Sequence, residues 1–284
     1  MIIPHYNDHA RLARCLDALK RDHLARPTEI LVVDNNSDQP LDDILSAHQD
    51  ARLVVEPKPG AATARNAGVA QSTAPRIFFL DADCVPDPDW IDQAYRAIEG
   101  QDIVGGKISV FDETPPPRSG SEAFETVFGF YQERYITEMQ FSVTANLLTW
   151  RHVWDDVGPL IHGLSEDREW CNRAVGKGFR LVYDPELAVS HPSRSDWPAL
   201  RKKWRRLTME SYALGAPTLT HRIRWILRAG AVLFSVLPHA PKVLGSKDLD
   251  TWQERLRGLG TLTRLRALRC LWMLRQSVGL PVPP

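Results

Sequence analysis

The sequence predicts an α/β fold, with a mostly parallel central sheet flanked by helices and a helical C-terminal extension. In the first part of the chain, short apolar runs that end in polar residues alternate with segments of helical spacing, the pattern of βαβ units. From about residue 196 the spacing is helical, with many Arg and Trp residues. The 284 residues are 43% hydrophobic and 25% charged, which fits a globular core and excludes a collagen-like or wholly disordered chain.

The first part of the chain supplies the strands of the predicted parallel sheet. Continuous apolar runs predict strands buried on both faces, and apolar residues at intervals of three and four predict helices. In order, we expect strand 1–3, helix 11–19, strand 29–34, strand 52–56, helix 61–71 and strand 76–80. The next helix is expected to open at 87–89, with Pro88 at its first position, where proline is favoured.

The pattern becomes irregular after Gly105 and Gly106. Three consecutive prolines at 115–117 stand in a polar stretch that predicts a loop. Beyond it we expect, in order, an aromatic-rich helix 124–135, strand 141–150, helix 166–175, strand 179–184 and helices from about 196.

The charges of the chain are divided between its two ends. Lys plus Arg and Asp plus Glu each number 35, so the net charge is zero, but residues 195–284 hold 16 basic and five acidic residues, a net +11. Residues 1–194 therefore carry −11. Basic residues beside Trp and Leu on helices favour either an anionic membrane surface or an ordinary subdomain packed on the rest of the chain. No nucleic-acid-binding motif is present, so we expect no nucleic-acid partner.

The four cysteines, Cys15, Cys84, Cys171 and Cys270, are widely spaced and form no Cys-x-x-Cys pair. This argues against a disulfide framework or a thiolate zinc site and favours a cytoplasmic protein. The N-terminus has no basic and apolar leader, so no signal peptide is expected. The longest apolar stretch, 229–237, is shorter than the ~20 residues that span a bilayer.

Acidic and polar residues follow three of the predicted strands. Ligands of open α/β sheets bind beyond the carboxyl ends of the strands, so these residues are candidates for a site. Asp81 and Asp83 stand one residue apart after strand 76–80, and two such carboxylates suit Mg²⁺ or Mn²⁺. Taken alone, the pair is better explained as the cap of a turn before the next helix.

The full set of motifs resembles that of the family 2 glycosyltransferases, which have the GT-A fold and transfer a sugar with inversion of its anomeric configuration. The resemblance covers about residues 1–210. It rests on the order and spacing of segments 2–7, 32–37, 60–68, 79–83, 145–147, 166–167 and 204–206. One segment departs from the family, because Asp34-Asn35-Asn36-Ser37 stands where Asp-Asp-x-Ser is usual. Asp34 is retained, but the contact with the base could differ.

The resemblance implies a nucleotide site and a metal site. Asp34 would accept a hydrogen bond from uracil, although an Asx turn is its alternative role. The residues implied in nucleotide binding are Pro4, Tyr6, Asn7, Asp34, Asn36, Arg65, Asp81 and Ala82. A cofactor, Mn²⁺ or Mg²⁺, would be held by Asp83, Asp81 and His191. An ordinary loop histidine and a surface ion pair are the alternatives for His191 and Arg65.

The resemblance also implies the catalytic residues. Asp167 would be the general base that takes the proton of the acceptor hydroxyl, with Glu166 as a less certain partner. Both carboxylates also stand where they would favour the positive end of a helix. The segment Trp204-Arg205-Arg206 resembles a Gln-x-x-Arg-Trp motif without its glutamine, which favours transfer of a single sugar. Arg205, Arg206, Trp204 and Asn146 are candidates for contacts with the diphosphate or the acceptor, and a solvated basic helix face is the alternative for the arginines.

These implications define the expected protein. Residues 1–195 would form the catalytic domain, with a nucleotide-sugar half at about 1–110 and an acceptor half at about 111–195, and 196–284 a basic helical region. The reaction would move a sugar from a UDP-sugar to a hydroxyl of a glycan or lipid-linked, cell-envelope acceptor. The location would be cytoplasmic or peripheral on the inner face of the membrane.

The main alternative is an inactive transferase-like domain that serves as a membrane-associated partner in glycan assembly. A nucleotidyltransferase would need a Gly-rich loop with Arg directly after the first strand. This chain has Pro4-His5-Tyr6-Asn7 there, which is not such a loop.

Overall fold

The computed structural model describes residues 1–20, 26–216 and 218–283. The chain divides into two compact units. The first unit holds residues 1–109 and 131–191, and the second holds 110–130 and 192–284. The segment 110–130 thus belongs with the C-terminal helices, and the domain boundary expected at residue 195 stays a prediction.

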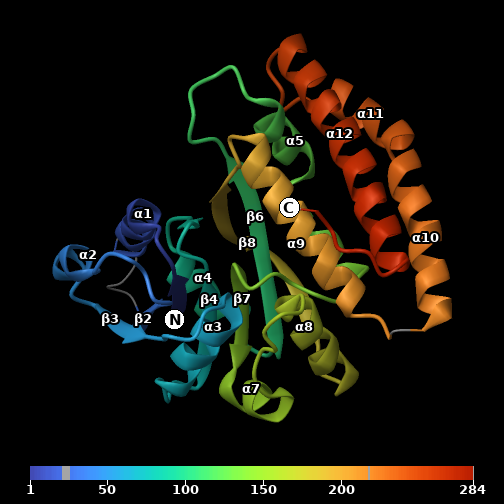
Figure 1. Cartoon of the computed structure of the whole chain (residues 1–284). Coiled ribbons are helices and arrows are strands. Elements are labelled where there is room, and N and C mark those ends of the chain that lie inside the picture. Colours follow the sequence, from blue (N-terminus) through green and yellow to red (C-terminus); the bar gives the residue numbers. More distant parts are fainter. Residues whose placement is uncertain (21–25, 217, 284) are drawn as a thin grey trace. The chain divides into compact units, whose positions relative to one another are not determined.

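The sheet confirms the α/β class that the apolar runs predicted (Figure 1). Its strands are β1 (Ile2–His5), β2 (Ile30–Asp34), β3 (Ala51–Val55), β4 (Arg76–Leu80), β5 (Val85–Pro86), β6 (Ile103–Phe111), β7 (Asn146–Trp150) and β8 (Leu181–Pro192). They lie in the order β3-β2-β1-β4-β7-β6-β8-β5. Strands β3, β2, β1 and β4 are parallel, whereas β7 pairs antiparallel with both β4 and β6. The parallel part brings the carboxyl ends of β1, β2 and β4 to one edge.

Helices cover both faces of the strands in the first unit, which is why β2 and β4 read as continuous apolar runs. One face is covered by α1 (His9–Lys20) and α4 (Trp90–Ala97). The other is covered by α3 (Ala61–Ala70), α7 (Arg151–Val157) and α8 (Glu166–Gly176), which share one apolar cluster with the strands. Two short helices, α2 (Asp42–Ala47) and α6 (Gln132–Thr137), complete the unit.

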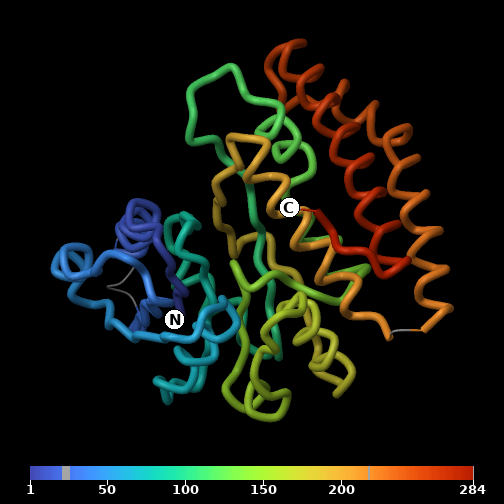
Figure 2. The backbone as a smooth tube through the Cα atoms, in the orientation of Figure 1, coloured from blue at the N-terminus to red at the C-terminus, as the bar shows by residue number. Residues whose placement is uncertain are grey.

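The second unit is helical, as the sequence predicted. It contains α5 (Gly120–Phe128), α9 (Trp197–Ala213), α10 (Leu219–Phe234), α11 (Val236–Leu244) and α12 (Trp252–Ser277). Figure 2 shows α10 and α12 running side by side, and Trp225 of α10 is buried against Met273 of α12. Within the described residues, no helix combines the length and apolar character needed to cross a bilayer.

Strands 141–150 and 179–184 are observed with other bounds, as β7 and β8, and three further expectations differ from the structure for identifiable reasons. The expected helix 124–135 is two helices, since α5 ends at Phe128 and α6 begins at Gln132. Gly129 follows the end of α5, and a Cβ there would lie 2.6 Å from the Glu125 carbonyl oxygen. The helix expected at 87–89 begins at Trp90, since Asp89 adopts a left-handed φ of 64°. The irregular stretch after Gly105 is the strand β6. Its glycines leave room for neighbours, because a Cβ on Gly105 or Gly106 would clash with Ser142 or Asn146.

Candidate active site

A cavity of about 530 Å³ lies at the carboxyl ends of β1, β2 and β4. Seven sequence-predicted residues line it, namely Pro4, Tyr6, Asn36, Arg65, Asp81, Ala82 and Asp83. Tyr6 is 61% exposed, so its ring belongs to the cavity wall and not to the core. The strand ends and the start of α3 therefore form one concave site, as expected for an open α/β sheet.

Arg65 links two groups of acidic residues in this site. Its helix, α3, begins after Gly60, which has a φ of 131° and lies so close to His162 that a side chain would not fit. The Arg65 side chain is only 5% exposed and forms ion pairs with Asp81 and with Glu166, whose Oε1 is 3.6 Å from its Nη1. A buried guanidinium thus joins the end of β4 to the start of α8, and the surface ion pair considered for Arg65 is excluded.

Asp167 has an unusual protonation equilibrium for an aspartate. Burial raises the pKa of its carboxyl to about 6, and the charge of Glu166 adds to the rise. Arg65 and the backbone N–H of Arg168, which donates to Asp167 Oδ1 at 3.1 Å, oppose this rise. A carboxylate that titrates near neutral pH is suited to accept a proton. Ser165 precedes α8, but its side chain makes no capping hydrogen bond with the first backbone N–H groups of the helix.

His191 and Asp83 face each other beside the cavity. The Nε2 atom of His191, on β8, is 3.3 Å from Oδ2 of Asp83. An imidazole nitrogen and a carboxylate oxygen fit a divalent cation whose other positions are filled by phosphate oxygens and water. Asp81 is engaged by Arg65. In the described ranges, no group of three or more His, Cys, Asp or Glu side chains is placed to hold a metal.

Asp34 lies at the end of β2 in a network with neighbouring side chains. The hydroxyl of Ser37 donates to its Oδ1 at 2.5 Å and the Ser37 N–H donates to its Oδ2 at 3.2 Å. The Nε2 atom of His5 accepts the N–H of Asp8 at 3.1 Å, so the ring proton lies on Nδ1, which donates to Asp34 at 3.1 Å. The Asx-type turn considered for Asp34 is therefore present.

Asn7, by contrast, ties the end of β1 to the loop after β2. Its side chain exchanges two hydrogen bonds with Asp38, at 2.8 and 2.9 Å. This pairing fixes the loop that carries Asn36, although neither Asn7 nor Asp34 lines the cavity itself.

Two asparagines that sequence reasoning did not select hold the walls of the site. The Asn35 amide donates to the carbonyls of Glu56 and Lys58 and accepts the Gly60 N–H at 2.7 Å, which shapes the loop before α3. The Asn66 amide donates to the Leu160 carbonyl at 2.9 Å and accepts the Leu160 N–H at 3.0 Å. Asn66 therefore holds the loop that leads to Glu166. Its position beside Arg65 was the signal that could have identified it.

We expect Asn66→Ala to destabilise the protein by about 2–4 kcal/mol, because it leaves both backbone groups of buried Leu160 without partners. Urea unfolding would measure this change, with Gln71→Ala at the exposed end of the same helix as the control. Equal stability of the two variants would show that Asn66 does not hold the loop.

The remaining predicted residues lie outside the cavity. Asn146 is fully buried, where its amide accepts the indole N–H of Trp90 and donates to the carbonyls of Lys107 and Leu187. The segment 204–206 lies on α9 in the second unit. There Trp204 packs on Phe124, Arg205 donates to the carbonyls of Val282 and Pro283, and Arg206 faces Glu210.

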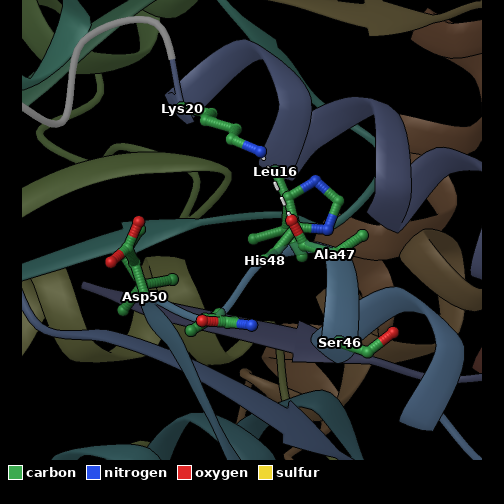
Figure 3. Close-up of a pocket in the computed structure, with 9 residues that line it drawn as sticks. Leu16, Lys20, Ser46, Ala47, His48 and Asp50 are labelled. Atoms are coloured by element: carbon green, nitrogen blue, oxygen red, sulfur yellow. Dashed lines mark hydrogen bonds between the residues drawn. The ribbon is translucent and has the colours of Figure 1, made fainter.

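A separate cavity of about 330 Å³ lies at the opposite ends of the strands, between α1 and α2 (Figure 3). Two of its polar side chains already have protein partners. Lys20 donates to the Ala47 carbonyl at 3.4 Å, and His48 contacts the Ile44 carbonyl and Asp17. None of the residues predicted from the sequence lines this cavity, so it adds nothing to the candidate site.

Comparison with known proteins identifies the class of this site. Residues 1–153 match the family described as Glycosyl transferase family 2. Glycosyltransferase AglE of Haloferax volcanii is 29% identical over 215 residues, which cover 72% of this chain and 70% of that protein. Pre-mycofactocin glycosyltransferase of Mycobacterium tuberculosis is 27% identical over 70% of this chain, but the match spans only 44% of that protein.

Two solved structures share the fold. Mannosyltransferase PcManGT from Pyrobaculum calidifontis, solved with GDP-Man and Mn²⁺, has a TM-score of 0.55 at 15% identity and is matched over 100% of this chain and 75% of its own. S. aureus TarS has a TM-score of 0.53 at 16% identity, over 97% of this chain and 54% of its own. The family match covers more than half of the chain, and the motifs at the strand ends form one cavity. The chain therefore belongs to glycosyl transferase family 2, has the GT-A fold and is a glycosyltransferase.

Proposed function

We propose that the protein transfers one sugar from a UDP-sugar to a hydroxyl of a glycan or lipid-linked acceptor, with inversion of the configuration at the anomeric carbon. The observation that carries this proposal is the buried Arg65, which links Asp81 in the nucleotide cavity to Glu166, next to Asp167. It joins a candidate donor site to a candidate base within one unit.

The nucleotide would occupy the cavity at the strand ends. Tyr6, exposed on its wall, offers a ring face for the base, and Pro4 and Asn36 complete this side. Asp34 Oδ2 has a second lone pair beside the one that accepts the Ser37 N–H, and it would accept a hydrogen bond from uracil at N3, with Asn7 holding the adjoining loop. Because a carboxylate also accepts from guanine, and PcManGT was solved with GDP-Man, the test of the donor includes both bases.

The metal would be Mn²⁺ or Mg²⁺, held by Asp83 and His191. When bound, such an ion neutralises charge on the departing diphosphate. Imidazole favours Mn²⁺ over the harder Mg²⁺. Asp81, as the partner of Arg65, would hold the guanidinium toward the diphosphate and contact the ribose beside Ala82.

Asp167 would take the proton from the acceptor hydroxyl as its oxygen attacks the anomeric carbon. The bond from that carbon to the diphosphate oxygen breaks as the new bond forms, and the nucleoside diphosphate leaves. Glu166 acts through Arg65 and through its charge, which helps to keep the pKa of Asp167 near neutral. Arg205, Arg206 and Trp204 stay predictions for diphosphate or acceptor contacts. Asn146 does not, because it is fully buried and its amide is bonded to Trp90, Lys107 and Leu187.

The protonation of Asp167 predicts the pH dependence of the reaction. With a pKa of about 6, the base is ionised above that pH and protonated below it. We expect kcat/KM to be constant above about pH 7 and to fall about tenfold per pH unit below 6. A profile that stays flat down to pH 5, in buffers of constant ionic strength, would contradict Asp167 as the base.

A thermal-shift panel tests the donor site directly. The protein is heated with Mn²⁺ and each of UDP, GDP, CDP and AMP, and with each nucleotide without metal. We expect the largest rise in melting temperature with UDP and Mn²⁺ together, because ligand binding stabilises only the folded state. If none of the nucleoside diphosphates raises the melting temperature, a nucleotide-sugar donor is contradicted.

The proposed location is the cytoplasmic face of a membrane. The net charge of +11 over residues 195–284 would hold the protein near anionic lipids, where a lipid-linked acceptor is presented. The Trp and Leu residues behind this proposal divide into two sets. Trp225 and Trp272 are buried within the second unit, whereas Leu227 and Leu271 are exposed.

A further inference from the structure

The outer face of α10 carries a row of large apolar side chains that are open to solvent. These are Leu219, Ile223, Ile226, Leu227 and Phe234, with Leu219 exposed by 74%, Leu227 by 69% and Phe234 by 68%. At about 100° per residue, they fall within an arc of roughly 100° on the helix. They therefore form one continuous stripe, here called the outer stripe.

The outer stripe is distinct from the face that α10 uses for folding. Trp225 and Ala229 are buried against Cys270 and Met273 of α12, and the Trp225 indole donates to Gln276 at 3.1 Å. The helix thus buries one apolar face within its own unit and presents a second to solvent. A soluble helix needs only the first, so the second indicates a binding surface.

The charges around the outer stripe indicate what binds there. Arg222 and Arg224 are exposed and lie on its two sides. From Ser211 to Lys247 the sequence contains no Asp or Glu. An apolar stripe bordered by arginines, within a unit of strong positive charge, is the pattern of a helix that lies in the interface of an anionic bilayer. Two copies of this face would instead bring like charges together, which argues against a dimer.

We propose that α10 lies flat in the headgroup layer of an anionic lipid bilayer, with the outer stripe toward the acyl chains and Arg222 and Arg224 at the lipid phosphates. With 16 residues, α10 would extend over about 24 Å of the membrane surface. This inference rests on the proposed membrane attachment and deepens it, since it names the helix and the face that enter the bilayer.

Flotation of the full-length protein with vesicles tests this proposal. The vesicles contain equal parts of phosphatidylglycerol and phosphatidylcholine, or phosphatidylcholine alone, at low ionic strength. We expect the wild type to float with the anionic vesicles only, and Ile223→Ser with Leu227→Ser to lower the partition coefficient at least tenfold. Both side chains are exposed, so this double variant should melt at the wild-type temperature.

A charge variant separates insertion of the stripe from general electrostatic attraction. Lys202→Gln with Lys247→Gln removes two exposed positive charges away from α10 and should lower binding less than the stripe variant. Equal binding by the stripe variant and the wild type would overturn the proposal. So would a wild-type dimer that the stripe variant abolishes, since the stripe would then be a contact between copies. Binding of UDP and Mn²⁺, measured without vesicles, reports on the proposed function independently.

Discussion

Asp167→Asn should lower the rate of sugar transfer by about 10²–10⁴-fold while nucleotide binding stays unchanged, because a positioned general base contributes about this factor. The amide keeps the shape of the side chain but cannot take the acceptor proton. Measured with saturating donor, the loss should appear in kcat, with the thermal shift by UDP and Mn²⁺ as in the wild type. Asp155→Asn, an exposed change on neighbouring α7, is the matched control.

The same variant carries a prediction about stability. The Asp167 carboxyl is protonated in both the folded and the unfolded chain below about pH 4, and it ionises first in the unfolded chain as the pH rises. Its favourable contribution to the free energy of unfolding is thus lost as the pH rises through about 6. At pH 7 the wild type should therefore be no more stable than Asp167→Asn. Retained turnover by this variant, or a large loss of stability at pH 7, would contradict the assignment.

Asp83→Asn should remove the metal-dependent part of nucleotide binding. It replaces the carboxylate that faces His191 with a neutral amide, so affinity for UDP in the presence of Mn²⁺ should fall by at least about tenfold. Binding of UDP without metal should change little. Isothermal titration calorimetry with and without Mn²⁺ measures both quantities.

Asp89→Asn is the control for this change. Asp89 is an exposed aspartate in the same loop region, and asparagine tolerates its left-handed backbone. It should bind UDP and Mn²⁺ like the wild type. Metal-dependent binding that survives in Asp83→Asn would remove Asp83 from the ligand set.

The parallel half of the fold could be predicted because its strands carry their own signal. Strands β2 and β4 are continuous apolar runs, and the structure places them within one residue of the expected bounds. Strand β6 could not be predicted in this way. Gly105 and Gly106 read as a break, yet they are needed because Ser142 and Asn146 lie against the strand, and these contacts join distant parts of the chain.

The candidate site shows the same division between local and distant information. Arg65, Asp81 and Asp83 could be predicted because they follow strands or open a helix, and strand ends meet at one edge of the sheet. The link from Asn66 to Leu160 spans 94 residues and has no local pattern. The pKa of Asp167 likewise depends on its burial and on the positions of Glu166 and Arg65, which only the folded chain defines.

The stereochemistry of the product tests the central claim, that transfer occurs in a single displacement with Asp167 as the base. The donor identified by the nucleotide panel is incubated with acceptor and Mn²⁺, and proton NMR follows the anomeric signal of the product as it forms. The account predicts an anomeric configuration opposite to that of the donor. A product that keeps the donor's configuration from the first turnovers would contradict it.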